Sequence, residues 1–183
     1  MTQPTTLAHL QVDSPLGRLL LIATDHGLVR LAFSTEGFAQ VLDTVTESLQ
    51  PDVVQPLPNT ATTAGRLIEQ AASELDDYFA GALTAFTVPV DFALSRGFHR
   101  EVREHLASIP YASTVSYSTI AEHLGRPQAV RAVGTGCSGN PVPIVVPCHR
   151  VLRADGSLGG YRAGAAAKAI LLDLERRSAA QAA

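Results

Sequence analysis

The spacing of apolar residues changes at Ser95-Arg96-Gly97, and this change limits the folds that the chain can adopt. Before this point, short apolar runs with turn signals alternate with helical spacing, whereas after it apolar residues recur almost only at helical spacing. A chain of 183 residues suits one medium domain or two small ones. We therefore expect an α/β protein in two parts, an N-terminal α/β domain over residues 1–95 and a mostly helical domain over residues 96–183.

The first part is predicted to be a small antiparallel sheet with helices. Three apolar runs between residues 7 and 33 are separated by Ser14-Pro15-Leu16-Gly17 and Asp25-His26-Gly27, which is typical of an antiparallel meander. Helical spacing predicts two helices, and alternation of Phe86, Val88 and Val90 predicts one more strand. The helices are expected over 38–49 and 67–79, with a loop at 51–58.

The second part is predicted to contain a helix-turn-helix and to resemble a winged-helix domain. Helical spacing is found over 98–109, 118–124, 127–133 and 165–177. Pro110 is expected to end the first of these helices, and Gly125-Arg126 joins the next two. This spacing is typical of a helix-turn-helix in which the second helix meets DNA, although two packed core helices produce the same pattern. A turn is expected at 153–157.

Residues 134–139, Gly-Thr-Gly-Cys-Ser-Gly, match the dinucleotide-binding pattern G-x-G-x-x-G. That motif works between a strand and the start of a helix, whereas here a helical pattern precedes it and Asn140-Pro141 follows. We therefore reject the motif, expect a loop, and predict that the chain needs no cofactor.

The run Pro143-Ile144-Val145-Val146-Pro147-Cys148-His149-Arg150-Val151 places a cysteine, a histidine and an arginine after an apolar, strand-like segment. Pro147 fixes φ and has no N–H, so the strand is expected to end there and leave Cys148 at the edge of a cavity. A free thiol has a pKa of about 8.5, so it needs a nearby base or positive charge, which His149 and Arg150 can supply. Side chains alternate along an extended segment, so we expect a water between Cys148 and His149, and a carboxylate that orients the imidazole.

Other interpretations of these residues are open. A cysteine taken alone is more often a buried apolar residue than a nucleophile, and the flanking residues are what favour catalysis by Cys148. Cys137 has no adjacent basic residue and is expected to be structural. The remaining histidines have no ligand spacing, so no metal site is predicted. Glu175 taken alone would be a surface residue, but its helix follows the Cys-His segment and can fold back to orient His149.

Charge is divided unevenly along the chain. Residues 1–97 carry four basic and eleven acidic side chains, a net charge of −7. Residues 98–168 carry eight basic and four acidic side chains, a net charge of +4. The second half therefore suits a polyanion, although a difference of this size also arises by chance. No apolar run has the length of a membrane helix, and the first residues lack the features of a signal peptide, so we expect a cytoplasmic protein without membrane association.

Several motifs together resemble one family. Pro147-Cys148-His149-Arg150-Val151, with Asn140-Pro141 before it and Gly159-Gly160-Tyr161 after it, resembles the active-site segment of the 6-O-alkylguanine-DNA alkyltransferases, which are single-use DNA repair proteins. Ser116-Tyr117 and Arg131-Ala132-Val133-Gly134 resemble the DNA-binding helices of that family. The resemblance is dense over residues 98–175 and thinner upstream, so it covers nearly the whole chain.

The resemblance implies an irreversible transfer of a methyl or larger alkyl group from the 6-oxygen of guanine in duplex DNA to Cys148, and leaves alkylated thymine open as a substrate. It implies minor-groove binding and flipping of the damaged base out of the helix. His149 would take the thiol proton through a water, Glu175 would orient His149, and Asn140 would hold the turn that shapes the pocket. The other implied site residues are Tyr117, Arg131, Ala132 and Gly134 for DNA, and Pro143, Val151, Tyr161 and Arg162 for the pocket.

The DNA-binding roles differ from residue to residue. Tyr117 would press on the target phosphate, Arg131 would fill the gap in the base stack, and the small Ala132 and Gly134 would let their helix approach the groove closely. The expected partner is double-stranded DNA that contains alkylated guanine, bound by a monomer.

Three positions depart from the family pattern. His99 and Arg103 stand where Gln and Trp are usual, and Arg162 stands where a small residue is common, so the pocket mouth is expected to be narrower or more basic. Two other functions stay open: a non-catalytic protein that binds alkylated DNA, and a Cys-His thiol hydrolase. Relatives of the first kind carry Trp at the position of Cys148, and Tyr117 and Arg131 have no role in the second.

Overall fold

The computed structural model describes residues 5–56 and 60–182, and the chain divides into two compact units, with the boundary in the sequence between Leu94 and Ser95. This boundary lies one residue before the one expected from the sequence. Residues 1–4 and the part of the expected 51–58 loop at 57 and 58 lie outside the described residues. None of the helices in the described part of the chain is long and apolar enough to cross a membrane.

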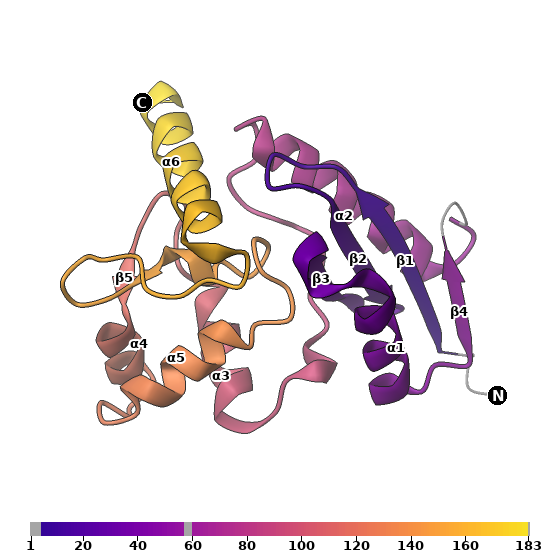
Figure 1. The fold of residues 1–183 in the computed structure, drawn as a ribbon, viewed down its shortest axis with the longest axis horizontal. Coiled ribbons are helices and arrows are strands. Elements are labelled where there is room, and N and C mark those ends of the chain that lie inside the picture. Colours follow the sequence, from indigo (N-terminus) through magenta and orange to yellow (C-terminus); the bar gives the residue numbers. More distant parts are fainter. Residues whose placement is uncertain (1–4, 57–59, 183) are drawn as a thin grey trace. The chain divides into compact units, whose positions relative to one another are not determined.

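The first unit is a four-stranded sheet with two α-helices, indigo to magenta in Figure 1. Its elements are β1 (Thr6–Val12), β2 (Leu19–Thr24), β3 (Gly27–Phe33), the 3-10 helix η1 (Ser34–Glu36), α1 (Phe38–Leu49), β4 (Val53–Pro56), α2 (Thr63–Phe79) and the 3-10 helix η2 (Phe92–Leu94). The strand order is β3-β2-β1-β4, and β1, β2 and β3 form the expected antiparallel meander.

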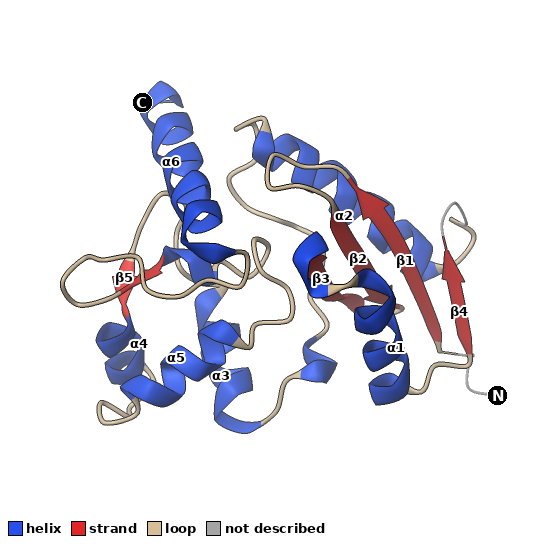
Figure 2. Ribbon diagram, in the orientation of Figure 1, coloured by secondary structure: helices blue, strands red, loops and turns tan. Residues whose placement is uncertain are grey.

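Helices cover both faces of this sheet. Every residue of β2 is buried, and because alternate side chains of a strand point to opposite faces, both faces of β2 are covered. Leu20 and Ile22 pack in one apolar cluster with Val45 of α1, and α2 contacts β1, β2 and β3 (Figure 2). Full burial of a Leu or Ile side chain contributes about 1.5–3 kcal/mol, so the sheet depends on both helices for stability.

Two predictions for the first unit are wrong. The loop expected at 51–58 contains β4, which pairs parallel to β1 at the sheet edge, and its valines are exposed, so it lacks the apolar alternation of a half-buried strand. The strand expected from Phe86, Val88 and Val90 is only an isolated bridge between Val90 and Leu28. Pro89 has no N–H to donate, and its carbonyl accepts the N–H of Leu28 at 2.8 Å.

The second unit is mostly helical, and the expected fold class is confirmed. Its elements are α3 (Gly97–Leu106), β5 (Val115–Ser116), α4 (Tyr117–His123), α5 (Val130–Ser138), the 3-10 helix η3 (Cys148–Arg150), β6 (Val151–Leu152) and α6 (Gly164–Ala182). β5 and β6 pair in parallel, with Ser116 opposite Leu152. β5 leads directly into α4 and β6 directly follows η3, so this pairing brings the helix-turn-helix and the Cys-His segment near one another in space.

Two predictions for the second unit are also wrong. The loop expected at 134–139 is helical through Ser138, because α5 packs so closely on α3 that a Cβ on Gly136 would lie 2.9 Å from Val102. Such packing outweighs the low helix propensity of glycine. The strand-like segment before Cys148 consists of turns, in which the N–H of Val146 donates to the carbonyl of Val142 and Ile144 has a φ of 75°.

Candidate active site

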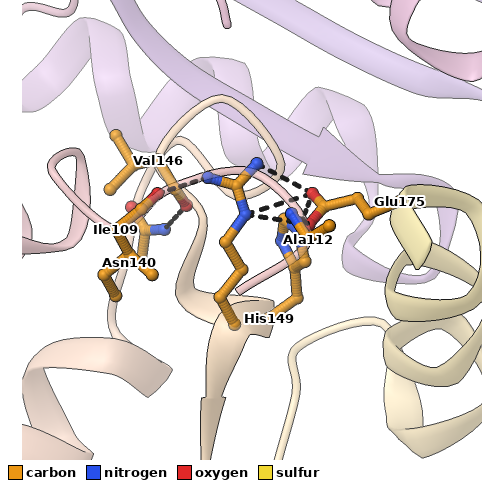
Figure 3. Close-up of polar contacts among 7 residues, drawn as sticks. Ile109, Ala112, Asn140, Val146, His149 and Glu175 are labelled. Atoms are coloured by element: carbon orange, nitrogen blue, oxygen red, sulfur yellow. Dashed lines mark hydrogen bonds and ion pairs between the residues drawn. The ribbon is translucent and has the colours of Figure 1, made fainter. Parts of the chain in front are cut away.

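The Asn140 side chain holds the turn that leads to Cys148. Its Nδ2 donates to the carbonyl of Val146 at 2.8 Å and to Sγ of Cys148 at 3.2 Å, and its Oδ1 accepts the N–H of Val142 at 3.1 Å. Figure 3 shows Asn140 with its amide directed at Val146. Asn140 is buried, so these bonds replace solvent, and they give the turn the partners that a sheet would otherwise provide.

Cys148 is the first residue of η3 and is 7% exposed. Burial raises the pKa of its thiol, while the hydrogen bond from Asn140 and the positive charges of Lys168 and Arg162 oppose that rise. The resting side chain is therefore a thiol at neutral pH. A thiol in this state becomes a strong nucleophile only if a neighbouring group takes its proton.

Glu175 on α6 joins three groups in a buried network, the side chains of Arg150 and His149 and the backbone N–H of Ala112. Its carboxylate accepts from Arg150, with the shortest contact at 2.8 Å, and from the N–H of Ala112 at 3.0 Å, and it lies 2.8 Å from Nε2 of His149. Arg150 also donates to the carbonyl of Ile109 at 2.6 Å. Figure 3 shows His149 and Ala112 converging on Glu175.

The network determines the charges of Glu175 and His149. Burial alone would raise the pKa of Glu175, but hydrogen bonds from His149 and Arg150 lower the pKa to about 2, so Glu175 is ionised. Burial lowers the pKa of His149, whose ring is therefore neutral at neutral pH. An ionised carboxylate only accepts hydrogen bonds, so Nε2 of His149 carries the proton and Nδ1 is the basic nitrogen. His149 is thus prepared to accept one proton through Nδ1.

The expected DNA-contacting residues lie on α4 and α5. Tyr117 begins α4 and is half-buried, and its hydroxyl would lie 3.0 Å from a Cβ on Gly159. Arg131 is exposed on α5, and Ala132 is half-buried beside it. A Cβ on Gly134 would meet no atom of the chain within 4 Å, so internal packing does not require glycine there. The surface of α5 at Gly134 is open to a partner from outside.

The expected pocket residues surround the Cys-His segment to different degrees. Pro143 and Val151 are buried, and the ring of Tyr161 meets the ring of His149 edge to face at 6.4 Å. Arg162 is exposed, and its guanidinium donates to the carbonyl of Ser138 at 2.9 Å. Arg162 therefore links the loop before α6 to the end of α5, near Cys148.

Lys168 is a site residue that the sequence reasoning missed. Its side chain is fully buried on α6, and Nζ donates to the carbonyl of Val151 at 2.6 Å and to that of Leu158. Burial lowers the pKa of Lys168, and the two cysteine sulfurs oppose this change. Lys168, Leu171 and Glu175 follow one another at helical spacing on one buried face of α6, which was the available signal.

Replacing Lys168 with methionine is expected both to slow the reaction of Cys148 and to lower the stability of the protein. Methionine fills a similar volume, but it leaves the Val151 and Leu158 carbonyls without their donor and removes a positive charge near the thiol. We expect a loss of about 1–3 kcal/mol in unfolding free energy, measured with denaturant, and a reaction rate at least about tenfold lower. An unchanged rate in the folded variant would contradict this assignment.

Two family models match the chain. The model described as "6-O-methylguanine DNA methyltransferase, DNA binding domain" matches residues 97–177, and the model described as "6-O-methylguanine DNA methyltransferase, ribonuclease-like domain" matches residues 8–92.

In the described part of the chain, no group of three or more His, Cys, Asp or Glu side chains is placed to hold a metal ion.

Relatives match over most of their length. A methylated-DNA–protein-cysteine methyltransferase of Mycobacterium leprae is 41% identical over 165 residues, 90% of each chain, and an inducible one of Bacillus subtilis is 47% identical over 114 residues, 62% of this chain and 63% of the relative. The crystal structure of the Mycobacterium tuberculosis O6-methylguanine methyltransferase has a TM-score of 0.75 at 36% identity and covers 94% of both chains. A structure of the M. tuberculosis protein with DNA has a TM-score of 0.72 at 36% identity, with 94% of each chain covered.

Proposed function

The chain belongs to the 6-O-methylguanine-DNA methyltransferase family. From this we propose that Cys148 is the residue that accepts the alkyl group in a DNA repair reaction carried out by the unit over residues 95–183. The protein transfers an alkyl group from alkylated guanine in DNA to its own cysteine. One observation best supports Cys148 in this role. His149, which directly follows Cys148 in the chain, pairs with the buried, ionised carboxylate of Glu175.

The proposed transfer is a single displacement. Nδ1 of His149 takes the Cys148 proton through a water, and the thiolate attacks the alkyl carbon on the 6-oxygen of guanine. A new carbon–sulfur bond forms as the carbon–oxygen bond breaks, and the released electron pair stays on guanine, which takes up one proton. The products are unmodified guanine and a thioether. A thioether is a poor leaving group, so each protein molecule reacts once.

Base extrusion is the second part of the proposal. The 6-oxygen of a stacked guanine lies out of reach, so the base must leave the duplex at a cost of a few kcal/mol. Arg131 is exposed on α5 and suited to fill the resulting gap, and the open surface at Gly134 suits close contact with a narrow groove. Tyr117, beside Gly159, is suited to press on the phosphate of the extruded nucleotide.

Replacing Arg131 with alanine is expected to slow repair of duplex DNA by at least about tenfold, the equivalent of about 1.4 kcal/mol, and to leave reaction with the free modified base almost unchanged. Only the duplex requires base extrusion. The measurement compares single-turnover rates on the two substrates. Equal losses on both would rule out a stack-filling role for Arg131.

The two other functions are less well supported. A protein that only binds damaged DNA has no use for a nucleophile with a prepared proton acceptor, and relatives across 90% of the chain are named as cysteine methyltransferases. A thiol hydrolase must release its product and turn over, for which a thioether is unsuited. We place the reaction in the cytoplasm, together with the DNA that it repairs.

Stoichiometry tests the proposed function. Methylguanine-containing duplex is supplied in excess, and repaired guanine is counted against protein over long times. We expect the product to stop rising at one molecule per protein molecule. Product that exceeds the protein in molar amount would overturn the single-use reaction.

A further inference from the structure

Arg103 on α3 is a buried cation to which the reaction described above assigns no part. Its side chain is 6% exposed. It stands where the 6-O-alkylguanine-DNA alkyltransferase pattern usually has Trp. Its guanidinium donates to the carbonyl of Gly139 at 2.7 Å, to the carbonyl of Gly136 at 3.2 Å and to Oγ of Ser95 at 2.6 Å. All three partners are uncharged, and among the described residues no carboxylate forms an ion pair with Arg103. Its positive charge is therefore not neutralised locally.

The hydrogen bonds of Arg103 hold the backbone directly before Asn140. A Cβ on Gly139 would lie 2.7 Å from Nη2 of Arg103, so the guanidinium occupies the space that a side chain at 139 would need. The next residue, Asn140, donates to Sγ of Cys148 and to the Val146 carbonyl. A short chain of contacts therefore runs from α3 through Gly139 and Asn140 to the thiol. Movement of Arg103 would alter the direction of the Asn140 amide.

The charge of Arg103 also acts on Cys148. The titratable groups whose charges interact with the thiol are Arg103 on α3, Tyr117 on α4, Cys137 on α5, Arg162 on the loop before α6 and Lys168 on α6, and His149 is adjacent in the chain. Burial raises the pKa of Tyr117 and of Cys137 and lowers the pKa of His149, so these three are neutral at neutral pH. The other three are cations. Their combined field favours a negative sulfur. Burial lowers the pKa of Arg103, but the cysteine sulfurs oppose this change and a guanidinium keeps its proton at neutral pH.

We propose that Arg103 is a positioning residue for alkyl transfer, which anchors the Asn140 turn to α3 and presents a buried positive charge to the Cys148 thiolate. The proposal rests on the proposed function, because it assigns Arg103 a part in the same transfer. It predicts two separable effects, one on the geometry of the turn and one on the pH at which the thiol reacts.

Two variants and one control separate these effects. Arg103→Met keeps much of the volume but removes both the charge and the hydrogen bonds, whereas Arg103→Lys keeps the charge and cannot reproduce the three-partner fork. Arg100→Met removes an exposed arginine of the same helix, which pairs with Glu104 at the surface. Single-turnover transfer from a methylguanine duplex is measured across pH, at a temperature where thermal melting shows each variant to be folded.

We expect Arg103→Met to react about 10- to 100-fold more slowly at neutral pH, with the midpoint of its rate–pH profile moved to higher pH. Arg103→Lys should keep the midpoint of the unmodified protein and still react more slowly, and Arg100→Met should change neither quantity. A variant Arg103→Met that melts lower but keeps the rate and midpoint of the unmodified protein would reduce Arg103 to a structural residue and overturn the proposal.

A double-mutant cycle covers the case in which Arg103→Met does not fold. If Arg103 acts through Asn140, Arg103→Lys should slow transfer much less in an Asn140→Ala background than in the unmodified protein. Equal slowing in both backgrounds would contradict the anchoring role. Failure of the unmodified protein to transfer any alkyl group would instead contradict the proposed function, so the two failures are distinguishable.

Discussion

Replacing Cys148 with alanine is expected to reduce alkyl transfer to the background rate while DNA binding stays nearly intact. The variant has no nucleophile at the turn held by Asn140, whereas the surface of α4 and α5 is unaltered. The measurement pairs a single-turnover repair assay with titration of a labelled duplex. Binding should weaken with added salt in both proteins, because phosphate contacts release counterions.

Cys137→Ala is the matched control for this experiment. Cys137 is also buried, and burial raises the pKa of its thiol to about 12, so it is a poor nucleophile at neutral pH. We expect this variant to transfer at a rate close to that of the unmodified protein. Repair by the Cys148 variant, or its loss in the Cys137 variant, would show that the acceptor is assigned to the wrong residue.

Replacing Glu175 with glutamine is expected to cause the largest loss of stability of any single change in the site. The substitution leaves Arg150 as a buried cation without its anion, and removing one partner of a buried pair typically costs about 3–5 kcal/mol. It also removes the anionic acceptor that keeps the proton on Nε2 of His149, so transfer should slow in the protein that remains folded. Chemical denaturation and single-turnover kinetics measure the two effects.

The same carboxylate predicts how stability depends on pH. The pKa of Glu175 is about 2 in the folded protein and 4.5 in its ordinary state, so its contribution is complete above 4.5 and is lost as the pH falls from there through about 2. A shift of this size corresponds to about 3 kcal/mol. The unmodified protein should therefore lose more stability in this acidic range than Glu175→Gln does, as denaturation at a series of pH values would measure.

Asp173→Asn is the control on the same helix. Asp173 pairs with Arg176 and Arg177 at the surface, where such pairs contribute about 0–1 kcal/mol. We expect a small change in stability and none in transfer rate. Equal losses of unfolding free energy in the Asp173 and Glu175 variants would mean that burial of the Glu175 network adds nothing to the stability of the protein.

Local sequence predicted the helices and the meander because each has its own apolar period. The elements that it missed depend on contacts from far along the chain. β4 is exposed and pairs with β1, far from it in the chain, and α5 continues past Gly134 and Gly136 because α3 packs closely against Gly136. The segment before Cys148 has the composition of a strand, but the side-chain amide of Asn140 binds its backbone and folds it into turns.

The candidate site divides in the same way. The Cys148-His149 pair and Glu175 could be selected from the sequence, because adjacent residue types and a family resemblance indicated them. Arg103 was indicated only as a departure from the family pattern, and Lys168 only by its helical spacing with Glu175. A charged residue in an amphipathic helix is usually exposed, and the folded chain is what places both residues within hydrogen-bonding distance of the backbone near Cys148.

Intact mass before and after incubation with a methylguanine-containing duplex tests the central claim most directly. We predict that the protein gains the mass of one methyl group in place of one hydrogen, and that fragmentation places this group on Cys148. A gain on another residue, a gain of more than one methyl group, or repaired DNA beside protein of unchanged mass would contradict the assignment of Cys148 as the single-use acceptor.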